Sequence, residues 1–535
     1  MRDWLRGLTL VVLLQLCACS GSGVPDQVPA AAPLLLPLAV RDGVLRDAQG
    51  REVILRGLNH IALRSDGRRP AYRVDGAVTP PELLFDLQDV EDEDFARIAA
   101  FGYNFIRPVF TWEFAQPDPP PAPYNETYFR LIDAFLDKAA AHGLYVVFDF
   151  GQFGWSRAAG GNAGAPPWAL SDTCLALPGR LASEPPQASA RVACAFQEFW
   201  QNEPVAGVGL QDAYIALWRE VMRRYRDHPA VVMVDLFNEP YGGLIPPLLL
   251  ETAYLYPFYR RLAGAIREID PDIVVGFQPE LYHSLGIPLP ATQAIGIDNA
   301  IFLPHNYSAA YFIQRVTPTY LPGQDAITRA DLMLTVEDAR TLGTPLLIGE
   351  TGWTRTTAVD GVEGPVPASD PEAPPQFGRS LVRLSDELKL GWAWFAYSSV
   401  DPAYGIIVDG AVDAPLMRSI ATPFPRAVSG RIDGFSFDAD SRRFELRASP
   451  SGSAPAQIAL PLQWQYPEGA CISIDGRSVA TLRSGGYMEQ DPAAPRLRYD
   501  SRRALLELAS TPPALTITPL SADCLFQANS PRQSR

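Results

Sequence analysis

The sequence predicts a (β/α)8 TIM barrel, an α/β fold, followed by a small antiparallel β-sandwich, and three observations support this prediction. From residue 50 to about 400, eight short apolar runs alternate with longer amphipathic segments. No glycine-rich phosphate loop follows the first run, which disfavours the competing doubly wound open sheet. After "TPFPRAVSG" (422–430) the chain changes to short alternating runs without a helical period. We therefore expect a domain boundary near residue 425.

The eight apolar runs are typical of strands that are buried on both faces, as in a parallel sheet covered by helices. One segment between them, "YFRLIDAFLDKAAAHG", places Phe129 and Ile132 on one helical face together with Phe135 or Leu136. The runs are "EVILRGLN" (52–59), "YNFIRPVF" (103–110), "LYVVFDF" (144–150), "AVVMVDLF" (230–237), "DIVVGFQ" (272–278), "AIFLPH" (300–305), "TPLLIGE" (344–350) and "GWAWFAYS" (391–398).

Two long insertions interrupt the repeat, one from residue 151 to about 205 and one over residues 351–378. Both follow the carboxyl ends of predicted strands. Barrel enzymes keep their active sites at that end, so we expect both insertions to shape a site.

The N-terminus is typical of an export signal. Arg2 and Arg6 precede the apolar core "GLTLVVLLQL", and "LCAC" then ends at Cys19. This segment resembles a bacterial lipoprotein signal in which Cys19 becomes the lipidated first residue, although plain secretion is the alternative. We expect a signal peptide over 1–19 and a flexible linker over 20–38. The protein would then be exported and lipid-anchored at the cell envelope, on the outer membrane or surface, or otherwise secreted.

Composition and cysteine usage restrict the partners. The formal charge of −15 argues against nucleic acid or anionic lipid. No Cys or His spacing indicates a metal site, and we expect neither a metal nor an organic cofactor. In an oxidising compartment, Cys174, Cys194, Cys471 and Cys524 can form two disulfides in three pairings, of which local pairing is the simplest.

Two acids follow predicted strands at the same end of the barrel. Glu239 closes the fourth run in "VDLFNEP" (234–240), and Glu350 closes the seventh in "LLIGETGW". Hydrolysis of a glycoside with retention needs two carboxyl groups about 5 Å apart, one to protonate the departing oxygen and one to attack the anomeric carbon. Repulsion between the two charges would raise one pKa and keep that group protonated.

The motifs "GLNH", "FIRP", "NEP", "PHNY" and "GETG", in this order, resemble glycoside hydrolase family 5, the cellulase superfamily of retaining barrel enzymes. The resemblance covers roughly residues 40–425. It implies a catalytic domain over 39–425, with Glu239 as the acid/base and Glu350 as the nucleophile. The remaining residues, 426–535, would form the C-terminal β-sandwich.

The resemblance also implies substrate-binding residues. Arg107 matches the arginine that braces the nucleophile, although a structural ion pair is the alternative reading. Asn238 matches the amide that binds the sugar 2-hydroxyl. His305 and Tyr307 match the strand-six pair, in which the phenol donates to the nucleophile.

The eighth strand and the third carry less definite matches. Trp394, or else Trp392, matches the aromatic that stacks on the sugar, and packing in the core is the alternative for either. The family usually has a histidine soon after strand three, but this chain has Gly151 there. Gln152, Trp155 or a residue of the long insertion is the candidate replacement. Recognition of the sugar is therefore open, whereas the two carboxylates are retained.

The "PFPRAVSG" junction and "YPEGACISIDG" in the β domain resemble the endoglycoceramidase group, which cleaves the bond between a glycan and ceramide. The apolar loop "GGLIPPLLL" (242–250) fits two interpretations equally well: contact with such a glycosphingolipid, or packing of the loop against the protein. The alternative enzyme is a β-1,4-glucanase or mannanase acting on polysaccharide. The alternative from another class is a non-catalytic surface lipoprotein that binds glycans.

Overall fold

The computed structural model describes residues 35–60, 73–74, 77–78, 90–161, 164–180, 185–284, 286–287, 289–307, 319–321, 323–355, 370–397, 404–408, 410–521 and 524. The predicted signal peptide and most of the linker lie outside these residues. One compact unit begins at Leu35 and contains both the barrel and the C-terminal sheets. The domain limits given above therefore stay predictions.

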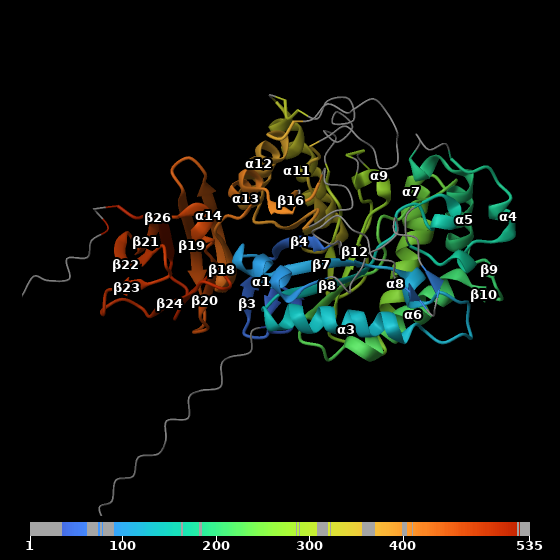
Figure 1. Ribbon diagram of the computed structural model, residues 1–535, viewed down its shortest axis with the longest axis horizontal. Coiled ribbons are helices and arrows are strands. Elements are labelled where there is room, and N and C mark those ends of the chain that lie inside the picture. Colours follow the sequence, from blue (N-terminus) through green and yellow to red (C-terminus); the bar gives the residue numbers. More distant parts are fainter. Residues whose placement is uncertain are drawn as a thin grey trace, which may run out of the picture. The chain divides into compact units, whose positions relative to one another are not determined.

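Eight parallel strands form the barrel that the apolar runs predicted, one strand from each run (Figure 1). They pair in the order β13-β12-β11-β8-β7-β4-β15-β14. Bridges of Phe302 with Leu346 and of His305 with Glu350 bring the two end strands together, so the barrel is nearly closed. The strands are β4 (Arg56–His60), β7 (Phe105–Phe110), β8 (Tyr145–Phe150), β11 (Val231–Asp235), β12 (Val274–Phe277), β13 (Ala300–Phe302), β14 (Leu347–Thr351) and β15 (Gly391–Trp394).

Amphipathic helices cover the outer face of the barrel. The predicted face of α3 is buried through Phe129, Ile132, Phe135 and Leu136, and Asn125 caps this helix by accepting from the first-turn backbone. The covering helices are α1 (Asp92–Ala100), α3 (Glu126–Ala141), α6 (Leu210–Tyr225), α8 (Tyr256–Arg267), α11 (Gln324–Leu342), α12 (Ala373–Leu388) and α13 (Ala414–Ile420).

Shorter elements lie in the connections, chiefly after the third and fourth barrel strands. They are β5 (Arg73–Val74), β6 (Ala77–Val78), α2 (Trp112–Ala115), η3 (Arg157–Ala159), η4 (Pro167–Ala169), α4 (Asp172–Leu175), η5 (Pro186–Ala188), α5 (Ala190–Trp200), β9 (Pro204–Val205), β10 (Val208–Gly209), α7 (Pro247–Leu249), the π-helix η6 (Leu250–Leu255), α9 (Leu281–Ser284), β16 (Ile407–Val408) and β17 (Ala411–Val412).

The C-terminal region is antiparallel and is organised around one long strand, β18 (Phe424–Asp438). The first half of β18 pairs with β3 and β20, and its second half pairs with β19, so β18 belongs to two sheets around one apolar cluster. Along β19 buried and exposed residues alternate, as the period-two pattern predicted. The other elements are β19 (Arg443–Pro450), β20 (Ala456–Ala459), α14 (Leu462–Gln465), β21 (Gly469–Ile474), β22 (Arg477–Arg483), β23 (Met488–Gln490), β24 (Leu497–Asp500), β25 (Leu505–Leu508) and β26 (Ala514–Pro519).

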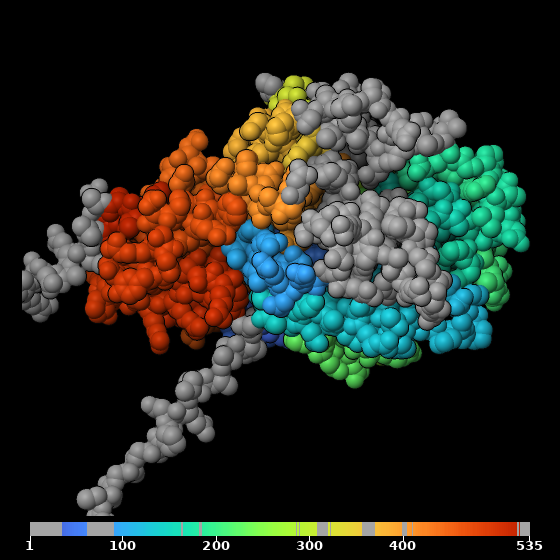
Figure 2. Space-filling model, in the orientation of Figure 1, coloured from blue at the N-terminus to red at the C-terminus, as the bar shows by residue number. Residues whose placement is uncertain are grey.

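Three strands that precede the barrel join this C-terminal sheet. They are β1 (Leu38–Arg41), β2 (Val44–Asp47) and β3 (Arg51–Val53), and β3 pairs antiparallel with β18. A buried ion pair also links the barrel to β18: Arg56 donates to Asp386 at 2.7 Å, and Asp386 accepts from the Phe437 backbone at 2.8 Å. Figure 2 shows the surface of the C-terminal region in orange and red.

The disulfides join Cys174 to Cys194 and Cys471 to Cys524, which confirms the local pairing. The first lies in the insertion after strand three, where it ties α4 to α5. Such bonds persist in oxidising compartments and indicate an extracytoplasmic protein. Within the described ranges, we find no helix of the length and apolar character needed to span a membrane.

Candidate active site

Arg107 lies at the centre of the barrel mouth and is fully buried on β7. Its Nη1 atom donates to Glu350 Oε1 at 2.6 Å and to Asn59 Oδ1 at 3.1 Å. Its Nη2 atom donates to Asn238 Oδ1 at 2.7 Å and to Asp235 Oδ2 at 2.8 Å. One planar guanidinium thus connects the ends of strands one, two, four and seven.

Asp149 and Asp235 complete the buried charge around this arginine. Asp149 Oδ2 lies 3.1 Å from Arg107 Nη2. Burial opposes the charge on Arg107, but the surrounding carboxylates outweigh it and raise the pKa of the guanidinium. Burial also raises the pKa of Asp149 well above its usual range, although Arg107 partly offsets this. The arginine therefore stays charged, and the raised pKa of Asp149 favours the neutral form of that carboxyl.

Glu350, in β14, has a donor on each carboxylate oxygen. Oε1 accepts from Arg107, and Oε2 accepts from the Tyr307 hydroxyl at 2.8 Å. The backbone bridge between His305 and Glu350 fixes the position of this residue from the neighbouring strand. These contacts orient the carboxylate.

Glu239 follows β11 in a different environment. Its backbone adopts a φ of 41°, a left-handed conformation that is strained for a residue other than glycine. Its N–H donates to Gln278 Oε1 at 2.9 Å and its carbonyl accepts from Gln152 Nε2 at 3.1 Å, which hold this conformation. Burial raises the pKa of the Glu239 carboxyl to about 7, against a smaller opposing effect of Arg107.

The two carboxylates face each other across His305. Oxygen atoms of Glu239 and Glu350 and a ring nitrogen of His305 all lie within 4.8 Å of one another. His305 Nδ1 is 2.9 Å from Glu239 Oε1 and 3.4 Å from Glu350 Oε2. Burial lowers the pKa of His305 to about 4, so the ring is neutral and can accept from a protonated Glu239 or donate to an ionised one.

This spacing separates two kinds of chemistry. Carboxyl groups of inverting glycosidases lie roughly 6.5–9.5 Å apart to leave room for a water, whereas those of retaining enzymes lie about 5 Å apart. The short separation in this chain therefore suits direct attack by one carboxylate. Among the described residues of the barrel mouth, these three side chains also lie close enough together to hold a metal ion. A metal ion bound there would occupy both carboxyl groups and leave neither for catalysis.

Asn238 lies between Arg107 and the third strand. Its Nδ2 donates to the Gln152 carbonyl at 2.7 Å, and Gln152 Nε2 donates back to the Asn238 carbonyl at 2.7 Å. Gln152 thus fixes the end of strand four. A Cβ atom at Gly151 would lie 2.3 Å from Val109 Cγ1, so Val109 fills the space that a side chain at position 151 would enter.

The structure does not bring Trp394 to the carboxylates. Trp394 is fully buried, packs against Phe377 of α12, and donates through Nε1 to the Tyr404 carbonyl at 3.4 Å. Trp392 is also fully buried, beside Arg56. Phe395 instead is partly exposed, with its ring centroid 6.5 Å from that of Tyr307.

Sequence reasoning missed several residues of this site. They are Asn59, Asp149, Asp235, Gln278 and Phe395. The first four share one signal: each is a polar residue within or directly after an apolar run, at the carboxyl end of a barrel strand. A buried strand seldom carries such residues without a partner.

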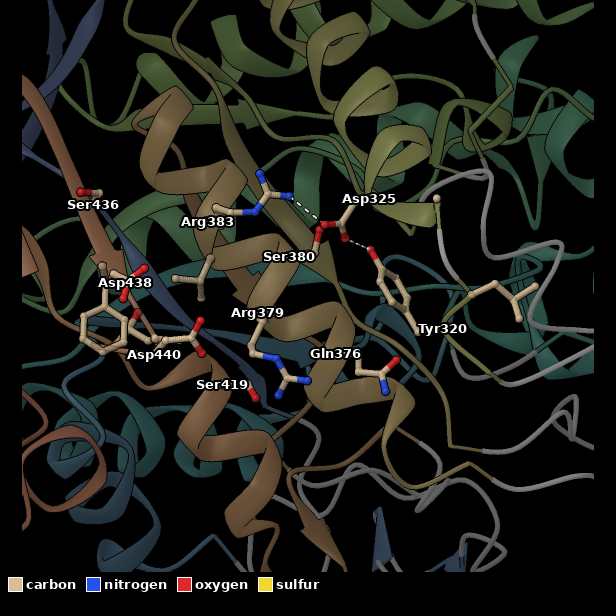
Figure 3. Close-up of a pocket in the computed structure, with 16 residues that line it drawn as sticks. Tyr320, Asp325, Gln376, Arg379, Ser380, Arg383, Ser419, Ser436, Asp438 and Asp440 are labelled. Atoms are coloured by element: carbon tan, nitrogen blue, oxygen red, sulfur yellow. Dashed lines mark hydrogen bonds and ion pairs between the residues drawn. The ribbon is translucent and has the colours of Figure 1, made fainter. Parts of the chain in front are cut away.

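A separate surface hollow of about 760 Å³ lies among α11, α12, α13 and the turn after β18. Asp325 accepts there from Tyr320 at 2.6 Å and from Arg383 at 2.9 Å (Figure 3). None of the site residues lines this hollow.

Comparison with known proteins agrees with this geometry. A profile of the cellulase family (glycosyl hydrolase family 5) matches residues 84–399, and one of the glycoside hydrolase family 5 C-terminal domain matches 423–498. Endoglycoceramidase I of Rhodococcus hoagii is 24% identical over 456 residues, covering 82% of each chain. The endoglycoceramidase of Cyanea nozakii is 24% identical over 481 residues, covering 81% of this chain and 85% of its own.

A solved structure of endo-glycoceramidase II from Rhodococcus sp., a lactosyl-enzyme intermediate, has a TM-score of 0.68 and 25% identity. The match covers 90% of this chain and all of that one. The family match spans most of the barrel and includes both Glu239 and Glu350. This chain therefore belongs to glycosyl hydrolase family 5 and is a glycoside hydrolase of a retaining family.

Proposed function

We propose that this enzyme cleaves the β-glycosidic bond between a glycan and a ceramide-like lipid. Support comes from relatives that are named endoglycoceramidases and that match over four fifths of the chain. A separate profile of the family's C-terminal domain matches residues 423–498, so the likeness is not limited to the catalytic barrel.

In the first step, a Glu350 oxygen attacks the anomeric carbon and the bond from that carbon to the lipid oxygen breaks. Glu239 donates its proton to the departing oxygen, so the lipid leaves as an alcohol. The sugar is then esterified to Glu350. The observation that carries this proposal is the difference between the surroundings of the two neighbouring glutamates. Burial raises the pKa of Glu239 to about 7, whereas Glu350 accepts two hydrogen bonds.

In the second step, the ionised Glu239 removes a proton from water, and the water oxygen attacks the anomeric carbon. The bond to Glu350 breaks, and the sugar leaves with its original configuration. His305 serves both states of Glu239, because neutral imidazole accepts from the acid and donates to the carboxylate.

Arg107 and Tyr307 bind the nucleophile in this scheme. They orient the Glu350 carboxylate, and Arg107 also fixes Asn238 Oδ1. One N–H of Asn238 Nδ2 then donates to the sugar 2-hydroxyl. For the sugar platform we propose Phe395 in place of Trp394, because the Phe395 ring is partly exposed beside Tyr307 whereas Trp394 is fully buried.

Hydrolysis of a short substrate panel tests the assignment. The panel holds lactosylceramide, a cello-oligosaccharide, a manno-oligosaccharide and aryl β-glycosides, with products resolved by mass. Release of intact ceramide supports the proposal. Cleavage of the oligosaccharides alone refutes it and assigns the enzyme to polysaccharide. Glycan binding without turnover of any substrate would make the protein a binder.

We also propose that the exported chain is anchored through a lipid on Cys19 at the bacterial cell envelope. The "LCAC" segment supports this proposal, together with two disulfides that indicate an extracytoplasmic protein. Cys19→Ser should move the protein from the membrane to the soluble fraction, whereas an unchanged distribution contradicts the anchor.

A further inference from the structure

Three leucines are exposed on the loop that follows the catalytic acid. Leu244 is 76% exposed, Leu248 is 55% exposed and Leu249 is 50% exposed. No other stretch of six residues in the described ranges exposes so many large apolar side chains. We call these three residues the leucine rim. Such a patch marks an interaction surface more often than an isolated exposed leucine does.

The leucine rim stands on a rigid base. Gly243 has a φ of 63°, and a Cβ atom there would lie 2.3 Å from the Ala193 carbonyl oxygen of α5. Next to the rim, the chain enters η6, where Leu250 is buried and Thr252 Oγ1 donates to the Leu248 carbonyl at 3.0 Å.

A polar anchor holds the far side of this base. Glu251 is buried in η6, and its Oε1 accepts from the Glu280 backbone at 3.1 Å. These contacts anchor the loop on both sides of the rim leucines, whose side chains lie on the surface.

The position of the rim relates it to the leaving group. Glu239 protonates the departing oxygen in the proposed mechanism, so the lipid must lie on the Glu239 side of the sugar. The rim begins at Leu244, five residues later in the chain. The Leu281 backbone at the start of α9 donates to the Pro240 carbonyl at 2.7 Å, which ties the beginning of the loop to α9.

Charge identifies the kind of surface that the rim fits. No Asp, Glu, Lys or Arg occurs from Pro240 to Leu250, and the chain carries a formal charge of −15. An anionic membrane would repel such a protein, whereas a zwitterionic one would not. Transfer of uncharged apolar side chains from water into the acyl region of a membrane is favourable, so it lowers the free energy of the bound state.

We propose that the leucine rim seats the enzyme on a neutral, zwitterionic lipid surface, from which lipid-linked substrate reaches Glu239. This inference rests on the proposed function, because a polysaccharide hydrolase would have no use for such a seat. The apolar loop that the sequence left undecided is then a lipid contact rather than internal packing.

The test uses the full chain with Cys17→Ser and Cys19→Ser, so that no attached acyl chain contributes to binding. In this background, Leu248→Ser with Leu249→Ser removes most of the rim. Leu334→Ser is the matched control, because Leu334 is 49% exposed on the outer helix α11. Co-sedimentation with phosphatidylcholine vesicles measures binding. Hydrolysis of lactosylceramide in those vesicles and of a soluble aryl β-glycoside measures activity.

The rim variant should bind vesicles about tenfold or more weakly, and should cleave vesicle lactosylceramide correspondingly more slowly. The rim variant should cleave the aryl glycoside at the rate of the parent protein. Leu334→Ser should match the parent in both vesicle binding and activity. Added salt should not weaken vesicle binding. Equal vesicle binding by rim variant and parent overturns the proposal. So does binding to anionic vesicles alone, or a dimer of the parent that the rim variant loses while vesicle binding persists.

Failure of the proposed function gives a different result. A parent that cleaves the aryl glycoside but releases no ceramide, either from vesicles or from detergent solution, refutes the glycolipid assignment. Vesicle binding by the leucine rim is measured on phosphatidylcholine vesicles without glycolipid. That measurement therefore tests the lipid contact even if the glycolipid assignment fails.

Discussion

The ends of strands four and seven carry the same side chain in opposite surroundings. Glu350 accepts hydrogen bonds from Arg107 and Tyr307, one on each carboxylate oxygen. The Glu239 carboxyl contacts the neutral ring of His305, and burial raises the pKa of Glu239 to about 7. The difference shows that one barrel mouth can prepare one carboxyl group for attack and another for proton donation, with oxygen atoms within 4.8 Å of each other. The cause is the unequal distribution of hydrogen-bond donors.

The largest expected effect comes from removing the nucleophile. Glu350→Ala should lower turnover by at least about 10⁴-fold, because no other group attacks the anomeric carbon. The protein should remain folded, since Arg107 keeps its contacts with Asp235 and Asn238. Circular dichroism and turnover of an aryl glycoside check both statements, and activity near that of wild type would remove Glu350 from this role.

Added azide distinguishes the two carboxylates. In Glu350→Ala, azide should enter the vacated space and give a glycosyl azide of inverted configuration. In Glu239→Ala, azide should attack the sugar already bound to Glu350 and give retained configuration. Nuclear magnetic resonance of the product reads the configuration, and the same configuration from both variants contradicts the assignment.

The next effect concerns the proton on Glu239. Because the protonated form is required for the first step, kcat/KM should fall as the pH rises through about 7. Glu239→Gln should remove this alkaline limb. It should also lower kcat/KM by about 10²–10⁴-fold for substrates whose leaving group needs a proton. An aryl glycoside with an acidic leaving group should lose much less, and an unchanged limb in the variant would assign that pKa elsewhere.

A smaller effect on turnover, but a large one on stability, is expected for Arg107→Lys. Lysine cannot reproduce the forked contacts to Glu350, Asn59 and Asn238. We expect a loss of about 10²–10³-fold in kcat and of about 3–5 kcal/mol in the free energy of unfolding. Arg340→Lys, at an exposed position on α11, is the control for denaturant unfolding.

The sequence predicted the barrel well because continuous apolar runs and helical periodicity are local signals. It did not predict that β1, β2 and β3 join the C-terminal sheet. The alternating pattern of a short strand does not indicate which distant strand it pairs with, and β18 lies hundreds of residues further along the chain. Glu239 and Glu350 could be found because each ends an apolar run with a recognisable motif. Phe395 could not be separated from Trp394, because the direction of a side chain depends on where the strand stops pairing.

The smallest expected catalytic effect is at a third buried acid, and it asks whether burial alone prepares an acid for catalysis. Burial raises the pKa of Glu280 to about 8, higher than that of Glu239, yet Glu280 Oε2 accepts from the Tyr282 backbone at 2.8 Å. We expect Glu280→Gln to leave kcat and its pH profile unchanged, because Glu280 makes no contact with Glu239, Glu350 or His305 in the described structure.

Stability should respond instead. The folded pKa of Glu280 lies above its unfolded value, so the unfolded state releases this proton first as the pH rises. The free energy of unfolding therefore falls between about pH 4.5 and about pH 8, and Glu280→Gln should remove this contribution. Urea unfolding at several pH values measures it. If the alkaline limb of the kcat/KM profile near pH 7 shifts in Glu280→Gln, then the Glu280 carboxyl contributes to the pKa of Glu239.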